Sequence, residues 1–273
     1  MLFDLSIEPE PPDDPMLSLR RLRSLLLLLG AACAPAGAVV NGTVAGGHEQ
    51  WPVGVFESDQ LPPTLGGASC SNFLIAADWV LTAGICVQSI AVGTHVLFYA
   101  PIDTDQCGGA HGDVSEVFTA PNGKVQLLHL ANACDLHVPH FILNDGAPPA
   151  VGTKLYDMGW GGASQIPLTG ITAVTDKSGL AIDEIAFAGA NLFCTGSDDD
   201  GGPHFDYGSN GFPVAYAIFD HSDAGCTQYD VSVRIDTLIS FITSHVGAVC
   251  LRSNPTGAAC DGLLRNGFDA ALN

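Results

Sequence analysis

The acidic turn DDDGGP at 198–203 brings together side chains that could do chemistry. Clustered carboxylates beside glycine could bind calcium, which takes several oxygen ligands from a turn. Three adjacent aspartates do not alternate as the ligands of a calcium loop do, so we expect a solvated acidic run and no metal. The nine histidines offer no zinc-like spacing, because Pro139 stands between His137 and His140 and prevents a helical arrangement.

Short β-rich runs must position this turn. VLFYA (96–100) and FPVAYAIF (212–219) are typical of strands, and the 32 glycines and 17 prolines supply many turns. Only DTLISFITSHV (236–246) has helical spacing, with its apolar residues on one face. The chain of 273 residues is long enough for one large all-β domain or two smaller ones.

The N-terminal region is typical of a targeting segment. Three arginines (Arg20, Arg21, Arg23) precede the apolar run Leu25–Leu29, and Ala36-Gly37-Ala38 is a small-residue cleavage pattern. We therefore predict an N-terminal extension and secretory signal over 1–38, with cleavage after Ala38. The run is too short to remain as a membrane span. The acidic, proline-rich residues before Met16 suit no export signal, which favours Met16 over Met1 as the start.

The cysteine count agrees with export. Cys33 lies near the position of a lipoprotein cysteine, which leaves lipidation as an alternative to a discarded signal-segment cysteine. The other eight of the nine cysteines form an even number, as disulfides in an oxidising compartment require. We predict a secreted or periplasmic protein.

The charge balance excludes one class of partner. The chain carries 9 basic and 29 acidic side chains, and the first 38 residues hold three of the former and five of the latter. The mature part keeps six and twenty-four, a net charge of −18. Nucleic acid needs Lys and Arg against its phosphates, so we expect no nucleic-acid partner. The acidic surface favours solubility outside the cell.

Six short motifs, in this order and at this spacing, resemble the chymotrypsin/trypsin-like serine peptidase family. They are VVNG (39–42), Trp51-Pro52, CSNFLIAADWVLTAGIC (70–86), MGWG (158–161), DDDGGP (198–203) and GCTQYDVSVRIDTLISFI (225–242). The resemblance covers about Val39 to Val246 and implies two packed six-stranded antiparallel β-barrels with a short C-terminal helix. It predicts a peptidase-like domain over 39–246 and a disulfide-containing tail over 247–273.

The family's catalytic serine, histidine and aspartate are only partly present here. The resemblance puts Asp135 at the aspartate position, Ile85 at the histidine position and Asp200 at the serine position. Isoleucine can neither take nor return a proton. A carboxylate attacks amides poorly and repels the negative charge that the oxyanion site must bind. Asp198 also replaces a glycine of the oxyanion loop. Losing base and nucleophile together removes the covalent route.

Other side chains could replace the missing pair only in a rebuilt site. Ser197 lies three residues from Asp200, and His204 is close in sequence, although His204 would need a different cleft. Asp135 and His137 have no serine beside them. We expect no such rescue.

The resemblance also implies an N-terminal insertion pair and a disulfide set. Cleavage after Ala38 would free the Val39 ammonium to pair with Asp199, the residue before the serine position. The implied disulfides are Cys70–Cys86, Cys194–Cys226, Cys107–Cys134 and Cys250–Cys260. An alternative alignment, in which LFCTG (192–196) carries an earlier cysteine of the family, stays open, and no specificity residue is assigned.

Three functional hypotheses follow. The first is an exported peptidase homologue without activity that binds an unknown protein or peptide through the retained cleft, as a monomer without cofactors. The alternative is an active serine-type endopeptidase with a non-standard arrangement. The third is a structural or decoy surface protein.

Overall fold

The computed structural model describes residues 39, 41–44, 52–57, 70–88, 90–98, 111–134, 140–160, 168–194, 199–209, 211–255 and 260. They all belong to one compact unit, Ala36–Asn273. The predicted signal segment and the part of the predicted tail after Cys260 lie outside the described residues.

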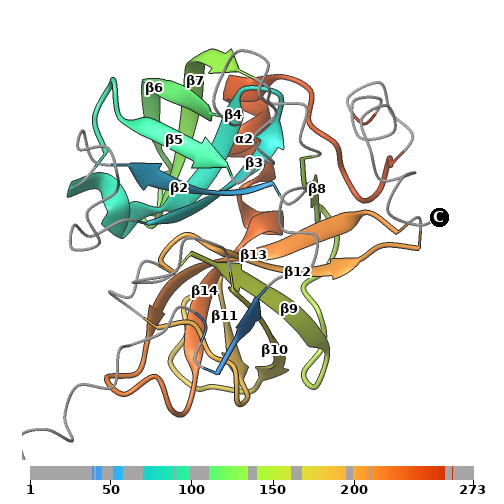
Figure 1. The fold of residues 1–273 in the computed structure, drawn as a ribbon. Coiled ribbons are helices and arrows are strands. Elements are labelled where there is room, and N and C mark those ends of the chain that lie inside the picture. Colours follow the sequence, from blue (N-terminus) through green and yellow to red (C-terminus); the bar gives the residue numbers. More distant parts are fainter. Residues whose placement is uncertain are drawn as a thin grey trace, which may run out of the picture. The chain divides into compact units, whose positions relative to one another are not determined.

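The first half of this unit is a closed antiparallel barrel. Its strands follow the order β2-β3-β4-β7-β6-β5 around the ring, and Figure 1 shows them in blue to green. The 3-10 helix η2 (Gly84–Gln88) follows β4 directly. The strands are β2 (Val53–Glu57), β3 (Ser71–Ala76), β4 (Trp79–Ala83), β5 (His95–Phe98), β6 (His111–Thr119) and β7 (Val125–Cys134).

The second half is a closed antiparallel barrel as well. Its ring order is β9-β10-β11-β14-β13-β12, because β9 pairs with both β10 and β12. The strands are β9 (Lys154–Gly159), β10 (Leu168–Thr175), β11 (Glu184–Ala188), β12 (Pro203–Tyr207), β13 (Pro213–Ser222) and β14 (Asp230–Arg234). Two short strands join from outside: β1 (Thr43–Val44) pairs with β10, and β8 (Ile142–Leu143) runs parallel to β13. The predicted fold, two six-stranded antiparallel barrels, is confirmed.

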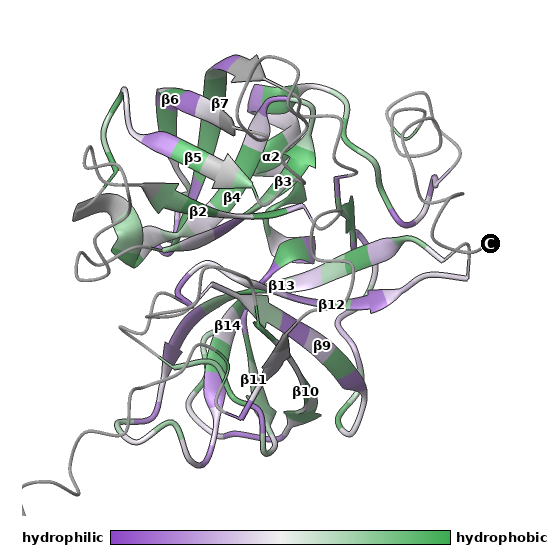
Figure 2. Cartoon of the chain, viewed as in Figure 1, coloured by the Kyte–Doolittle hydropathy of each residue, from purple (hydrophilic) through white to green (hydrophobic). Residues whose placement is uncertain are grey.

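Continuous apolar runs form strands here because both strand faces are buried. In β3, Phe73 and Ile75 belong to a core shared by the two barrels, whereas Leu74 between them points into the first barrel. The same alternation sends Leu127 and Leu128 of β7 to these two cores, as a side-chain period of two requires. Burying each such side chain contributes about 1.5–3 kcal/mol. Figure 2 shows that β9, in contrast, mixes polar and apolar residues along its length.

Trp160 joins the two barrels. Its backbone N–H donates to the Ser71 hydroxyl oxygen at 2.9 Å, and its indole N–H donates to the Val53 carbonyl at 2.9 Å. Both acceptors belong to the first barrel, while Trp160 follows β9 of the second. The tryptophan of the MGWG motif therefore fixes β9 against the first barrel.

The C-terminal helix forms where its spacing predicted it. A 3-10 turn, η3 (Ile235–Thr237), leads into α2 (Ile239–Val246). Ile242 is fully buried in the shared core, and His245 lies 4.2 Å from the ring of Phe118 on β6, measured between ring centroids. The helix thus covers part of the outside of the first barrel.

Candidate functional site

Ile85 lies on η2, in the turn that leaves the first barrel. The turn begins at Gly84, whose N–H donates to the Lys124 carbonyl at 2.6 Å. A Cβ at Gly84 would come within 2.2 Å of the Gly123 carbonyl oxygen, so only glycine fits there. Cys86 is buried and disulfide-bonded to Cys70 at the start of β3. Between these fixed neighbours, Ile85 stays 52% exposed.

Asp200 lies in a tight turn that enters the second barrel. The Gly202 N–H donates to the Asp199 carbonyl at 2.8 Å, and the Gly201 N–H donates to the Phe219 carbonyl of β13 at 3.0 Å. Gly201 has φ +91°, a conformation that favours glycine. These contacts leave Asp200 only 6% exposed.

The two turns meet where the barrels join. The Cys86 sulfur lies 3.7 Å from the carbonyl oxygen of Asp200. A Cβ on Gly201 would lie 2.3 Å from the Ser71 carbonyl oxygen and 2.4 Å from the Thr82 hydroxyl. The resemblance implied that Ile85 and Asp200 belong to one site, and the structure places the chain neighbours of both residues, Cys86 and Gly201, at this junction.

The chemistry available at this junction is limited. Ile85 has no titratable group, and Asp200 offers a shielded carboxylate directly after the fully buried Asp199. His204, the nearest described imidazole along the chain, is fully buried inside the second barrel and cannot reach this surface. Asp135, His137, Ser197 and Asp198 lie outside the described residues. The described residues at this junction include no imidazole, and the Thr82 hydroxyl beside Gly201 is buried and donates to the Ser71 carbonyl at 2.8 Å.

Val39 and Asp199 both border Phe193 in the second barrel. Val39 is 1% exposed and packs with Phe193 and Phe219. Asp199 accepts a hydrogen bond from the Cys194 N–H at 3.3 Å. A Cβ on Gly159 would meet both Asp199 Oδ1 at 2.4 Å and the Phe193 ring at 3.2 Å. The valine that cleavage would make N-terminal is thus buried one side chain away from its expected partner.

Three disulfides join described cysteines: Cys70–Cys86, Cys194–Cys226 and Cys250–Cys260. They are three of the four pairings that the resemblance implied. The pairing of Cys194 with Cys226 is the one that the resemblance implied. It does not require the alternative alignment of the LFCTG segment. Cys107, the fourth pair's first member, lies outside the described residues.

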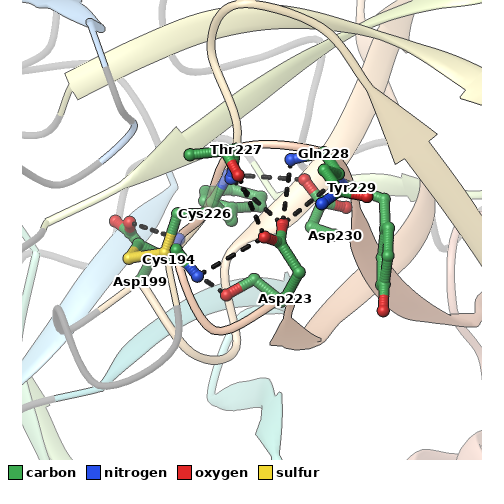
Figure 3. Close-up of a disulfide and its surroundings, with 11 residues drawn as sticks. Cys194, Asp199, Asp223, Cys226, Thr227, Gln228, Tyr229 and Asp230 are labelled. Atoms are coloured by element: carbon green, nitrogen blue, oxygen red, sulfur yellow. Dashed lines mark hydrogen bonds between the residues drawn. A yellow bond between two sulfur atoms is a disulfide. The ribbon is translucent and has the colours of Figure 1, made fainter.

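One aspartate orders the loop around Cys226. Figure 3 shows the Asp223 carboxylate facing the backbone of the loop. It accepts hydrogen bonds of 3.0–3.4 Å from the backbone N–H groups of Gly225, Thr227, Gln228 and Tyr229. Burial alone would raise the pKa of Asp223, but these backbone donors outweigh it and lower the pKa to about 2. The loop beside the Cys194–Cys226 disulfide is therefore held rigidly.

Sequence reasoning missed a buried charge cluster in the second barrel. His204 Nδ1 lies 2.6 Å from Asp157 Oδ1, and its Nε2 lies 3.3 Å from Asp230 Oδ1. All three side chains are 0% exposed. The signal available was that Asp157, His204 and Asp230 each stand between two uncharged residues that are apolar or aromatic. Without the strand register, however, nothing in the sequence connects residues 47 positions apart.

Among the described residues, no group of three or more His, Cys, Asp or Glu side chains is arranged to hold a metal ion. Over the same residues, no helix reaches the length and hydropathy that a bilayer span requires.

Comparison with known proteins gives one family and one fold. The trypsin family model matches residues 39–242. The crystal structure of the scabies mite inactivated protease paralogue S-I1 superposes with a TM-score of 0.56 at 16% sequence identity, over 72% of this chain and 95% of that one. No curated protein sequence matches the chain.

Proposed function

The chain belongs to the trypsin family, and from this premise we propose that it is an exported peptidase homologue without catalytic activity, which binds a protein or peptide at the junction of its two barrels. The binding surface centres on Ile85 and the turn that carries Asp200. Cleavage of the signal after Ala38 frees Val39, whose ammonium pairs with Asp199 and orders this turn.

The pair Ile85 and Asp200 carries the proposal. Peptide hydrolysis by this family needs a base that accepts the nucleophile's proton and returns it to the leaving amine. An aliphatic side chain does neither. The Asp200 carboxylate, 6% exposed and adjacent to Asp199, would repel the oxyanion that forms during acyl transfer. Both changes oppose the same reaction step.

Two further observations support binding as the function. Ile85 keeps half of its surface exposed on a turn fixed by a disulfide, which gives a preformed apolar contact point. The scabies mite paralogue of the same fold is described as an inactivated protease, so this fold occurs in a protein without peptidase activity. The three disulfides fit an oxidising, extracytoplasmic compartment.

The catalytic half of the proposal is tested on the purified secreted protein. A fluorophosphonate probe should leave it unlabelled, and casein should stay intact. N-terminal sequencing of the same sample should begin at Val39. Labelling that disappears in Ser197→Ala, together with casein cleavage, would instead establish the alternative, a serine endopeptidase with a non-standard arrangement.

The binding half is tested with matched surface variants. The immobilised protein should capture a partner from extracellular proteins at a saturable site, and Ile85→Lys should abolish this capture. Val151→Lys is the control. Val151 is also an exposed aliphatic residue, but it lies in the turn before β9, whereas Gly159 at the other end of β9 borders Asp199. Equal loss in both variants, or no saturable capture, would favour a structural or decoy role.

A further inference from the structure

Asp157, His204 and Asp230 form a buried cluster in the second barrel, and each of the six strands of that barrel contributes one residue to it or to its surroundings. His204 comes from β12, Asp157 from β9 and Asp230 from β14. Phe187 of β11 stacks on the imidazole with ring centroids 3.7 Å apart and an interplanar angle of 11°. The two remaining strands contribute the Thr172 hydroxyl, which donates to Asp157 Oδ1 at 2.9 Å, and Ala217, the cross-strand neighbour of His204.

Protonation of the imidazole halves the net charge of this cluster, from −2 to −1 when both carboxylates are ionised. The titratable side chains in contact with His204 are Asp157 and Asp230, and the faces that β10, β11 and β13 present carry Thr172, Phe187 and Ala217. A protonated imidazole offers one N–H to each carboxylate. A neutral imidazole would leave two buried carboxylates repelling each other at zero exposure, which is unfavourable in a medium of low dielectric.

Electrostatics and burial set the pH range. Burial lowers the pKa of His204, but the charges of Asp157 and Asp230 outweigh burial and raise it to about 9. Burial raises the pKa of Asp157 to about 6, against the charge and hydrogen bond of His204. Because the pKa values of His204 and Asp157 are higher in the folded protein than in the unfolded chain, both groups favour the folded barrel at low pH. The His204 contribution is complete below about 6.5 and is lost as the pH rises through 9.

The cluster is coupled to the candidate binding turn through Phe193. The Phe193 N–H donates to Asp230 Oδ2 at 3.3 Å, and its ring meets the imidazole edge-on with centroids 4.9 Å apart. The same residue packs against Val39, and the next residue, Cys194, donates to Asp199. Movement of the cluster therefore reaches the turn that carries Asp200.

We propose that Asp157, His204 and Asp230 form a pH-responsive lock, which keeps the second barrel and the Asp199–Gly202 turn ordered in mildly acidic to neutral surroundings and loosens both in alkaline surroundings. The lock depends on the buried charge cluster and not on the partner that the junction binds, so the two proposals can fail separately.

The experiment measures local and global opening of the secreted protein between pH 6 and pH 9. The equilibrium constant for opening, from hydrogen exchange at the Gly201 and Gly202 amides corrected for intrinsic rate, should rise roughly a hundredfold over this range. Urea unfolding should show the same trend. His204→Gln should open more readily at pH 6 and lose most of the pH dependence. His221→Gln is the control, because His221 also contacts an aspartate, Asp220 at 2.9 Å, but on an exposed site.

A second measurement needs no variant to fold. Nuclear magnetic resonance of the wild-type protein, labelled in its histidine rings, should show the His204 imidazole still charged at pH 7.5. An imidazole already neutral at pH 7, or amide protection that stays constant from pH 6 to pH 9, would refute the lock. An equal loss of pH dependence in His221→Gln would refute it as well.

Discussion

Replacing Gly201 with alanine should separate the two reasons for glycine in the acidic turn. At φ +91° any other residue is strained, which costs about 1–2 kcal/mol. The new Cβ would also lie 2.3 Å from the Ser71 carbonyl oxygen and 2.8 Å from the Ala83 nitrogen. Both are backbone atoms that cannot swing aside, and overpacking of this kind costs about 1–3 kcal/mol. The free energy of unfolding should fall by about 2–5 kcal/mol, a large part of the stability of a domain.

Gly179→Ala supplies the matched comparison. Gly179 has φ +83° and no atom within 4 Å of an added Cβ, so its replacement measures backbone strain alone. Urea unfolding and calorimetry should show a loss of about 1–2 kcal/mol for Gly179→Ala and a clearly larger loss for Gly201→Ala. At about 2–4 °C per kcal/mol, the midpoint for Gly201→Ala should drop by roughly 4–20 °C. Equal losses in the two variants would mean that the Asp200 turn is not pressed against the first barrel.

Two more expectations concern the loops that flank the second barrel. The pKa of Asp223 is lowered to about 2, so Asp223 stabilises the fold above about pH 4, and this contribution is lost as the pH falls through 2. Acid unfolding followed by circular dichroism should therefore depend less steeply on pH for Asp223→Ala than for the wild type. Equal slopes would contradict the role of its backbone hydrogen bonds. The Cys250–Cys260 disulfide joins residues that are 10 positions apart in the sequence. Replacing both cysteines with serine should lower the free energy of unfolding, measured in urea, by about 3 kcal/mol. An unchanged midpoint would show that the disulfide does not constrain the unfolded chain.

The sequence predicted individual strands and the C-terminal helix because the relevant signals are local, whereas the two-barrel architecture came from the resemblance. The strand run now found as β13 and the apolar face of α2 both depend on neighbours a few residues apart. The glycines of the Asp199–Gly202 turn and Trp160 of the MGWG motif could be placed by resemblance. Their physical reasons, the 2.3 Å approach to Ser71 and the bond to Val53, became visible only in three dimensions.

The charge cluster could not be predicted from the sequence for the opposite reason. Asp157, His204 and Asp230 become neighbours through the closure of the barrel. Closure pairs β9 with β12 and places β14 across the barrel from β9. A histidine or aspartate in a strand does not indicate which distant strand supplies its partner. The exposure of Ile85 was equally inaccessible, because it depends on how η2 leaves β4 and not on the apolar character of the side chain.

The junction of the two barrels is held by its frame more than by the side chain of Ile85. Ile85 is half exposed, so its side chain contributes little to packing, and Asp200 touches the first barrel through its backbone carbonyl. Gly201, Trp160 and Cys86 hold the same junction together through backbone approach, hydrogen bonds and a disulfide. A substitution at Ile85 therefore costs the scaffold little, whereas a substitution in this frame costs several kcal/mol. A scaffold of this kind keeps a fixed surface around position 85 whatever side chain stands there, which is the physical condition that the proposed binding role requires.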